Sequence, residues 1–377
     1  MKTADCTAAY KTVSDKVADY VRDLIIQNGL KRDECLPSYS ELAATLRCNR
    51  RTAMRGMDIL VAEGAVRRQR AQGCFVNREI SRQGRALKTI GIVHTSSTAH
   101  LFSHRYLQKI MQGIGDAPGH LDIQIYCMRG DGFVTAAQLA DRHVDGVILL
   151  GMESDAFVEE FATWGVPGVL VDQVSEKGEL DCVACDNEAA ARRAVRHLVE
   201  QGHRRIRYVA LDPRSLVQVG RSRTLLMRSS DRVERHDAAQ RALAAVPGMV
   251  RDEDILANTI EDSVFRHVVA TWRDDPQRPT AALVEDDMMA EKLTREMRRM
   301  GLSAPEDISL CAIASVGDLK FGEHPLACNR VDFTGMGRKA VEVLRRRCEE
   351  PAKAPAPQVY RVGSEWVEGR STREARA

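Results

Sequence analysis

The stretch that decides the fold of the N-terminal region spans residues 36–55 and reads LPSYSELAATLRCNRRTAMR. Ser38 and Glu41 have the spacing of a capping box, which predicts a helix beginning just after this serine. Asn49, a residue type that caps helices well, predicts the start of another helix that runs to about Glu63. Helical spacing then places four residues on the buried face of this second helix: Ala53, Met57, Leu60 and Val61.

A helix before this stretch and a hairpin after it complete the pattern. Residues 14–28 have apolar residues at helical spacing, with Ser14 as the expected N-cap and Gly29 as the stop. Val66 and Phe75-Val76 are expected to form two short strands around a turn at residues 71–73. The order helix, helix, turn, helix and hairpin predicts a winged helix-turn-helix.

The residue types on these elements suit DNA. Arginines at the N-terminal half of the third helix can contact guanine edges or phosphates in a major groove. The hairpin adds Arg67 and Arg68, and a glycine at its tip allows close approach to the minor groove. We therefore predict these DNA-binding residues: Ser38, Tyr39, Ser40, Asn49, Arg50, Arg51, Thr52, Arg55, Arg70, Gln72 and Gly73. A basic helix that binds a protein is the alternative.

Charge and composition agree with this prediction. Residues 1–88 contain 17 Lys and Arg and 10 Asp and Glu, whereas the whole chain has a net charge of only +2. A basic head on an acidic body favours a polyanionic partner for the head alone. No apolar run is long enough to cross a membrane, and no signal peptide precedes the head, so we expect a cytoplasmic protein. The close pair Cys182 and Cys185 has no second pair at zinc-finger spacing, and we expect no metal.

Residues 14–78 resemble the GntR-type winged helix. Residues 36–43 are similar to that family's motif L-P-S-E-R-E-L-A, and residues 49–54 stand where the family has S-R-x-T-V-R. Residues 73–76, GCFV, match the G-T-F-V of its wing. Ser40 and Met54 replace arginines of these motifs, which leaves the operator sequence open.

Beyond a polar, basic linker at residues 79–88, the chain predicts an α/β domain over residues 89–377. Short β-branched runs alternate with helical stretches, which favours a doubly wound parallel sheet with ligands at the carboxyl ends of its strands. The runs expected to be strands are residues 89–93, 121–126, 144–150, 168–172, 206–210, 281–284 and 308–313. The stretches expected to be helices include residues 106–114, 156–164, 188–201 and 288–300. The first 78 residues are expected to form the DNA-binding domain.

The C-terminal region is similar to the ligand-sensing domain of LacI-type repressors, which is related to periplasmic sugar-binding proteins. The resemblance implies a two-lobed, periplasmic-binding-protein-like fold. The stretches that carry it are 186-DNEAA-190, 202-GHRRI-206, 301-GLSAPEDIS-309 and 365-EWVEGRST-372.

The resemblance also implies which residues bind the effector. It places Asp287 in the cleft, where its carboxylate accepts from ligand hydroxyls. Arg232 follows if residues 232–236, RVERH, stand for the family's R-x-x-G-[FY]. Asp172 is a candidate by its position at a strand end. A lone aspartate at such a position is more often a helix cap, and the family's G-F-D near residue 313 is absent.

Together these features predict a DNA-binding transcriptional repressor, active as a homodimer on a double-stranded operator and controlled by a carbohydrate-like effector. We expect no enzymatic activity, no cofactor and no membrane association. Lys177 is the only lysine between Lys109 and Lys292, which disfavours the pyridoxal enzymes fused to some GntR heads. The main alternative is a regulator with a degenerate pocket, controlled by a protein partner or constitutive. The sequence leaves open whether ligand releases or tightens DNA.

Overall fold

The structure is a computed structural model of the 377-residue chain. It describes residues 12–27, 30–62, 64–69, 72–77, 86–95, 101, 104–127, 134–135, 138–139, 142, 144–219, 223–250, 253–321 and 324–375. The chain divides into two compact units. Residues 1–85 with 137–144 form the first unit, and residues 86–136 with 145–377 form the second. The expected boundaries at residues 78 and 88 stay a prediction.

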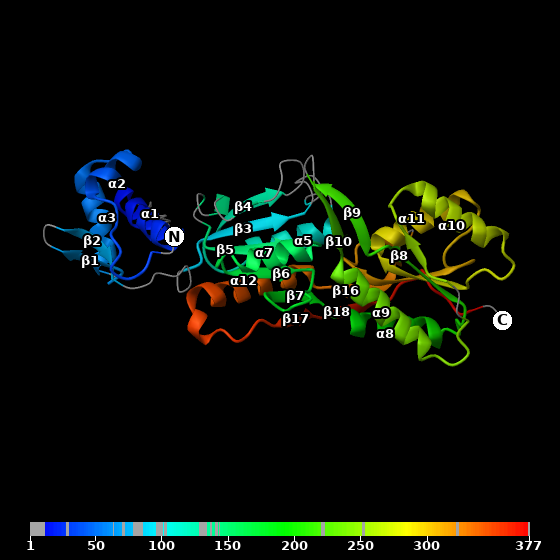
Figure 1. Cartoon of the computed structure of the whole chain (residues 1–377). Helices are drawn as coiled ribbons and strands as arrows, with labels where there is room; N and C mark the ends of the chain where they lie inside the picture. The colour runs from blue at the N-terminus through cyan, green and yellow to red at the C-terminus, as the bar shows by residue number, and fades with distance from the viewer. Residues whose placement is uncertain are drawn as a thin grey trace, which may run out of the picture. The chain divides into compact units, whose positions relative to one another are not determined.

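The first unit contains the expected helices and hairpin (Figure 1). Its elements are α1 (Val13–Gln27), α2 (Tyr39–Thr45), α3 (Arg50–Ala62), β1 (Val66–Gln69) and β2 (Gly73–Val76), with the two strands antiparallel. The capping box at α2 is formed, because the Glu41 amide donates to Ser38 Oγ (3.3 Å) and the Ser38 amide donates to Glu41 Oε2 (2.7 Å). Asn49 Oδ1 accepts from the Thr52 amide at 2.8 Å, as expected of a cap.

The prediction for the start of α1 was wrong. The helix begins at Val13, so Ser14 lies inside its first turn. Thr12 takes the capping role instead, since its Oγ1 accepts from the Asp15 amide at 3.2 Å while Asp15 Oδ2 accepts from the Thr12 amide at 2.8 Å. Gly29, Glu63 and Arg70 lie outside the described residues.

One core holds the three helices and the hairpin together. Ala53, Met57 and Leu60 of α3 are buried, as expected, against Val21 and Ile25 of α1. Val61 is only partly buried at the edge of this core. Burial of this apolar surface fixes the orientation of α3, so its opposite face is left to solvent.

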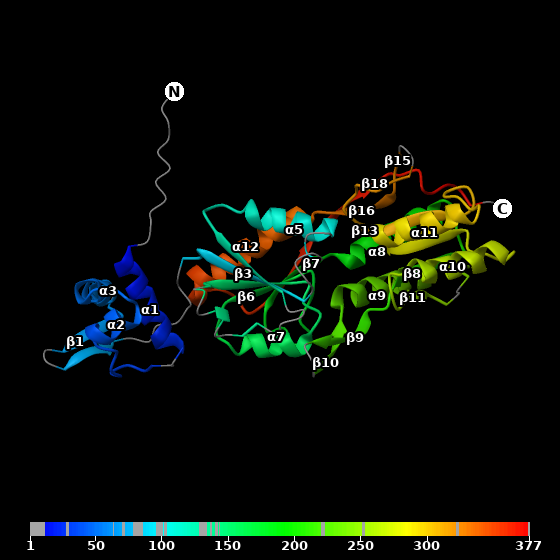
Figure 2. The ribbon, with the colours of Figure 1, turned by 90° about the horizontal axis from the view of Figure 1, so that it is seen from above.

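The second unit has two lobes, each built on a six-stranded sheet (Figures 1 and 2). The sheet of the first lobe is parallel throughout. Its strand order is β17 (Val359–Val362), β7 (Asp181–Cys185), β6 (Gly168–Val171), β5 (Gly146–Leu150), β3 (Thr89–His94) and β4 (Asp122–Cys127). Helices α5 (Arg105–Gly115) and α12 (Phe333–Glu349) cover one face, and α7 (Asp155–Ala162) covers the other, as Figure 2 shows. The short helix η1 (Pro351–Lys353) follows α12.

The sheet of the second lobe is parallel except for its last strand, β18, which pairs antiparallel with β16. Its order is β11 (Ile255–Ala257), β8 (Ile206–Leu211), β12 (Ala281–Asp286), β13 (Ser309–Ser315), β16 (Ala327–Val331) and β18 (Ser364–Val367). Two helices pack on each face, and each pair shares a buried apolar cluster with the sheet. The pairs are α8 (Asn187–Glu200) with α9 (Ser230–Ala244), and α10 (Asp262–Asp274) with α11 (Asp287–Arg299).

The chain passes between the lobes three times, after β7, after β16 and after β17. Two hairpins add to the lobes: β9 (Arg214–Val219) with β10 (Arg223–Arg228), and β14 (Lys320–Phe321) with β15 (His324–Pro325). The strands and helices expected from the sequence are all present, with ends that differ by a few residues. Within the described ranges, no helix is both long and apolar enough to span a bilayer.

Candidate functional site: a charged cavity and a basic helix

A cavity of about 490 Å³ opens in the second unit where strand ends of the two lobes face one another. His94 ends β3 and Asp172 follows β6 in the first lobe, while Asp286 ends β12 and Ser315 ends β13 in the second. These are carboxyl ends of parallel strands, which is where open α/β sheets bind ligands. The volume is that of an ordinary small-molecule site.

All three effector residues expected from the sequence line this cavity. Asp172 follows β6, Arg232 lies on α9 and Asp287 begins α11, three elements far apart in the sequence. The fold therefore brings the three candidates together at one cavity.

Asp287 is the first residue of α11, but it does not cap this helix. Asp286 is the cap, because its Oδ1 accepts from the Met289 amide at 2.9 Å. Asp287 Oδ2 instead accepts from Ser315 Oγ at 3.1 Å and from the Val316 amide at 3.3 Å. Burial still raises the pKa of Asp287 above its ordinary value. The division of roles leaves the Asp287 carboxylate oriented at the cavity wall.

Arg232 stands in the first turn of α9, where Ser229 caps the helix. Its Nε lies 3.7 Å from Oε1 of Glu285, a carboxylate with no exposed surface. Burial raises the pKa of Glu285 to about 7, although the positive charge of Arg232 acts against this rise. The arginine and the glutamate therefore partly balance each other beneath the cavity.

Asp172 combines an unusual backbone with an unpartnered side chain. Its φ is +62°, a left-handed conformation that non-glycine residues seldom adopt and that concentrates at functional sites. The residue is only 7% exposed, and within the described chain its carboxylate accepts no hydrogen bond and forms no ion pair. Burial first, and the neighbouring Asp231 second, raise the pKa of Asp172 well above its usual value.

Sequence reasoning missed a buried network beside Asp172. Arg235 forms an ion pair with Asp231 one turn earlier on α9 and donates through Nε to Asn187 Oδ1 at 3.1 Å. Asn187 Nδ2 donates to Asp231 Oδ1 at 2.8 Å. Arg235 occupies the position where the family motif has glycine, so it was read as a departure and not as a site residue. The RVERH stretch thus carries a second cavity arginine.

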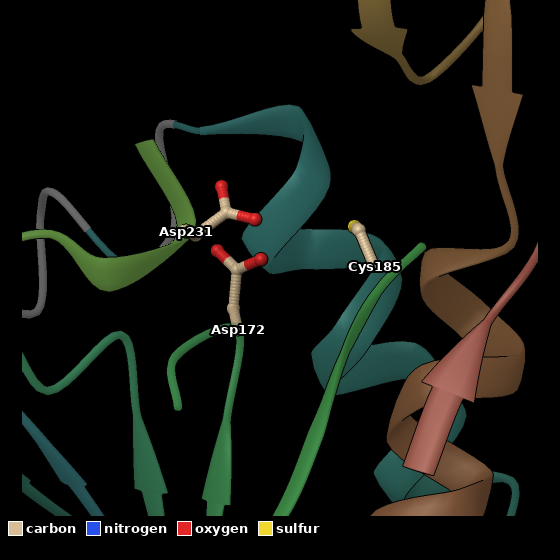
Figure 3. A group of neighbouring side chains, drawn as sticks. All are labelled: Asp172, Cys185 and Asp231. Atoms are coloured by element: carbon tan, nitrogen blue, oxygen red, sulfur yellow. The ribbon is translucent and has the colours of Figure 1, made fainter. Parts of the chain in front are cut away.

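Figure 3 shows Asp172 and Asp231 with their carboxylates facing each other, and Cys185 of β7 beside them. The potential ligand atoms of these three residues lie within 4.8 Å of one another, a spacing that could hold a metal ion. The donor set does not favour one. Burial raises the pKa of the Cys185 thiol well above its usual value, whereas metals bind the thiolate. Arg235 already holds Asp231, and its positive charge opposes a cation at that carboxylate.

An aromatic wall and two histidines complete the cavity. The rings of Tyr106 and Phe333 pack with their centroids 5.6 Å apart, and both residues line the cavity. His94 bonds through Nδ1 to the Leu150 carbonyl at 2.8 Å. Burial lowers the pKa of His94 and of His104, which favours their neutral forms near pH 7. No periodicity in the sequence predicts this wall, because its two aromatic residues lie more than 200 positions apart.

The first unit presents a second candidate surface on α3. Arg50, Arg51 and Arg55 are exposed at its N-terminal half. No hydrogen bond or ion pair engages these three guanidinium groups among the residues that the structure describes. Ser38, Ser40, Asn49, Gln72 and Gly73 are also exposed.

Other residues expected at this surface have structural partners. Tyr39 is half-buried, and its hydroxyl lies 3.3 Å from Cys74 Sγ. The Thr52 hydroxyl donates to Asn49 Oδ1 at 2.9 Å, so these two side chains define the start of α3. Arg67 pairs with Asp33 at 2.8 Å, and Arg68 pairs with Asp58 of α3. The hairpin arginines thus differ from those of α3.

Comparison with known proteins matches both units. The model of the bacterial regulatory proteins of the gntR family matches residues 13–76, and the model of the periplasmic binding protein-like domain matches residues 195–372. The chain thus carries a segment similar to the gntR family and, after it, a segment similar to periplasmic binding protein-like domains. Ser40 and Met54 lie within the first matched segment, and Arg235 lies within the second.

Two curated transcriptional regulators illustrate the similarity over longer parts of the chain. The chain is 30% identical over 234 residues to the HTH-type transcriptional regulator MalR of Streptomyces coelicolor, covering 58% of this chain and 61% of MalR. It thus spans about three fifths of that relative's length. It is 25% identical to the arabinose metabolism transcriptional repressor of Geobacillus stearothermophilus, over 86% of this chain and 88% of the repressor.

The fold is also that of a solved LacI family transcriptional regulator from Enterococcus faecium with bound ribose. The TM-score is 0.60 at 21% identity, covering 77% of this chain and all of the other. This likeness supports the fold of the second unit.

Proposed function

We propose that this protein is a transcriptional regulator that binds operator DNA through α3 and a small polyhydroxylated effector in the cavity of its second unit. The observation that carries the proposal is the pairing of two surfaces in one chain. One is a helix with three free guanidinium groups, and the other is a cavity with buried carboxylates at strand ends.

The charge of α3 supports the DNA half. Exposed guanidinium groups at a helix N-terminus meet phosphates or guanine edges without first breaking an internal ion pair. Arg50, Arg51 and Arg55 meet this condition. The relatives of the chain reported above are named as transcriptional regulators. The proposal includes a homodimer on two half-sites, since twofold proteins favour symmetric operators.

The cavity supports the effector half. Carboxylates and arginines offer several acceptors and donors to hydroxyl groups, and the Tyr106 ring offers an apolar surface to a sugar ring. The Enterococcus faecium neighbour holds ribose. A degenerate pocket would have no reason to retain Asp172 buried without a partner, because such a charge destabilises the fold unless a ligand compensates it.

Contacts between the lobes provide a route for control. Gln173 Oε1, in the first lobe, accepts from the amide (2.7 Å) and the hydroxyl (2.8 Å) of Ser230 on α9. The Arg228 amide donates to the Glu153 carbonyl at 2.7 Å across the same gap. A ligand that binds one lobe arrangement better than the other shifts the equilibrium by that difference in affinity.

The test uses the full chain and a DNA fragment that it selects from a random pool. Gel-shift titration with and without a panel of sugars measures the effect of each sugar on DNA affinity. Asp287→Ala should retain DNA binding and lose at least tenfold in sugar response, because the cavity loses a central acceptor. Asp274→Ala, a surface variant at the end of α10, is the control. A chain that selects no DNA sequence, or an Asp287→Ala variant with an unchanged response, contradicts the proposal.

A further inference from the structure

The charges that line the cavity are unbalanced. Carboxylates outnumber guanidinium groups, and both cavity histidines favour the neutral form. The acidic residues are Glu153, Asp172, Asp231, Asp286, Asp287 and Glu291, and the basic residues are Arg105, Arg232 and Arg235. In a site shielded from water, this excess of negative charge repels an anionic ligand and attracts a cationic one.

The two arginines of α9, Arg235 and the half-buried Arg232, do not correct the excess, because each already has a carboxylate partner. Arg235 is held by Asp231 and by Asn187 Oδ1. Arg232 faces Glu285, which lies behind the cavity wall and is absent from its lining. Arg105 is exposed at the start of α5, where water screens its charge.

Asp172 is the cavity carboxylate without a direct partner. It is nine-tenths buried, and within the described chain it has no hydrogen-bond donor and no ion pair, although the charges of Arg235 and Arg232 act on it from a distance. Its backbone is left-handed, and its carboxylate faces that of Asp231 (Figure 3). An isolated buried carboxylate costs several kcal/mol unless a partner is supplied. A ligand hydroxyl would supply one hydrogen bond but would leave the charge uncompensated.

We propose that the effector carries a protonated amine that binds the Asp172 carboxylate, and that it belongs to the amino sugars or related amino polyols. The inference rests on the proposed function, since it specifies the ligand class of the same cavity. The remaining carboxylates accept from the ligand's hydroxyl groups, and Asp231 and Glu153 add to the negative potential at the ammonium. Sugar acids and sugar phosphates are excluded from the site.

The test compares matched sugars by isothermal titration of the full chain. Each set has a neutral, an amino and an acidic member: glucose, glucosamine and glucuronate, then galactose, galactosamine and galacturonate. In at least one set, the amino sugar is expected to bind about tenfold more tightly than the neutral sugar, and the acid is expected not to bind. An equal or tighter neutral or acidic member overturns the inference but keeps the proposed effector site. If none of the six sugars binds at 50 mM, both proposals for the cavity fail.

Two variants assign the preference to Asp172. Asp172→Asn keeps the shape of the side chain and removes its charge, so the amino sugar should bind no better than its neutral counterpart. Glu306→Gln removes a surface charge outside the cavity and should change the preference less than threefold. If Asp172→Asn retains the preference for the amine, the ammonium binds elsewhere and the inference is wrong.

The thermal stability of the ligand-free protein tests independently whether the Asp172 carboxylate lacks a partner. Asp172→Asn should raise the Tm of the second unit by about 2 °C at pH 7.5, because it removes an uncompensated buried charge. The raised pKa of Asp172 means that the folded state binds its proton more tightly, so this gain should disappear as the pH falls towards 4. The groups that face Asp172 are Tyr106, Glu153, Cys185, Asp231, Arg232 and Arg235. A lower Tm for Asp172→Asn would mean that a partner already compensates the carboxylate, which would overturn the inference.

Discussion

The arginines of α3 and the arginines of α9 occupy opposite environments. Arg50, Arg51 and Arg55 are exposed and unpaired in the described chain, whereas Arg235 is buried, Arg232 is half-buried, and both face carboxylates. A free guanidinium group is available to a polyanion, while a compensated one mainly orients its neighbours. The same residue type therefore indicates DNA in one unit and a structured, negatively charged cavity in the other.

The largest expected effect is the loss of unfolding free energy when the buried Arg235 of α9 is removed. Arg235→Ala leaves Asp231 buried with Asn187 as its remaining donor, and breaking such a pair from one side typically costs about 3–5 kcal/mol of unfolding free energy. Urea unfolding followed by tryptophan fluorescence measures it. All three tryptophans, Trp164, Trp272 and Trp366, lie in the second unit, so the first unit does not contribute.

Arg298→Ala is the matched control, because Arg298 of α11 lies in the same unit and is exposed and unpaired in the described chain; its unfolding free energy should stay within about 0.5 kcal/mol of the parent chain. If the two variants lose similar stability, the distinction between compensated and free arginines fails.

The next effect concerns pH. Glu285 has its pKa raised to about 7, above its value in the unfolded chain, so the folded state is favoured by protonation. Its contribution is fully present below about pH 4 and is lost as the pH rises through 7. The charged groups that face it are Arg232, Arg235 and Asp286, with Tyr208 beside them.

Glu285→Gln should remove the part of the pH dependence of stability that comes from this carboxyl group. The fall in unfolding free energy between pH 5 and pH 8 should be smaller in the variant by about 1–3 kcal/mol. Identical pH profiles would show that Arg232 keeps Glu285 charged throughout this range.

The exposed arginines of α3 are expected to contribute to DNA affinity. Arg50→Ala should weaken binding to the selected operator by about 1–3 kcal/mol, because one base or phosphate contact is lost. Gel-shift titration at several salt concentrations measures both the affinity and its dependence on salt. Unchanged affinity would remove α3 from the DNA interface.

The sequence predicted what depends on local pattern and on strand ends. Ser38 with Glu41 predicted α2, and Asp172 followed from its position at the carboxyl end of a strand, whereas Asp287 followed from the resemblance to LacI-type repressors. Ser14 failed as a cap because Thr12 and Asp15 form the reciprocal bonds two residues earlier. A cap is decided by geometry within one turn, which residue type alone does not fix.

The rest of the cavity depends on long-range packing. Arg235 was read as the loss of a motif glycine, because its partners Asp231 and Asn187 become visible only when α8 and α9 pack together. Tyr106 and Phe333 meet across α5 and α12, a contact that no periodicity encodes. The charge balance of the cavity likewise requires knowing which arginines are already paired.

The smallest effect is expected at Arg67, in the hairpin of the first unit. This arginine is intermediate between the free arginines of α3 and the paired arginines of α9. Arg67 is partly exposed, pairs with Asp33 at 2.8 Å and lies over the Phe75 ring, 5.1 Å from its centroid. Surface ion pairs of this kind contribute about 0.2–1 kcal/mol. Arg67→Ala should therefore cost at most about 1 kcal/mol of stability in the first unit, measured by circular dichroism at 222 nm. Its operator affinity should fall less than that of Arg50→Ala, since Arg67 must leave Asp33 to reach a phosphate. A larger loss of DNA affinity for Arg67→Ala would place the hairpin, and not α3, at the centre of the interface.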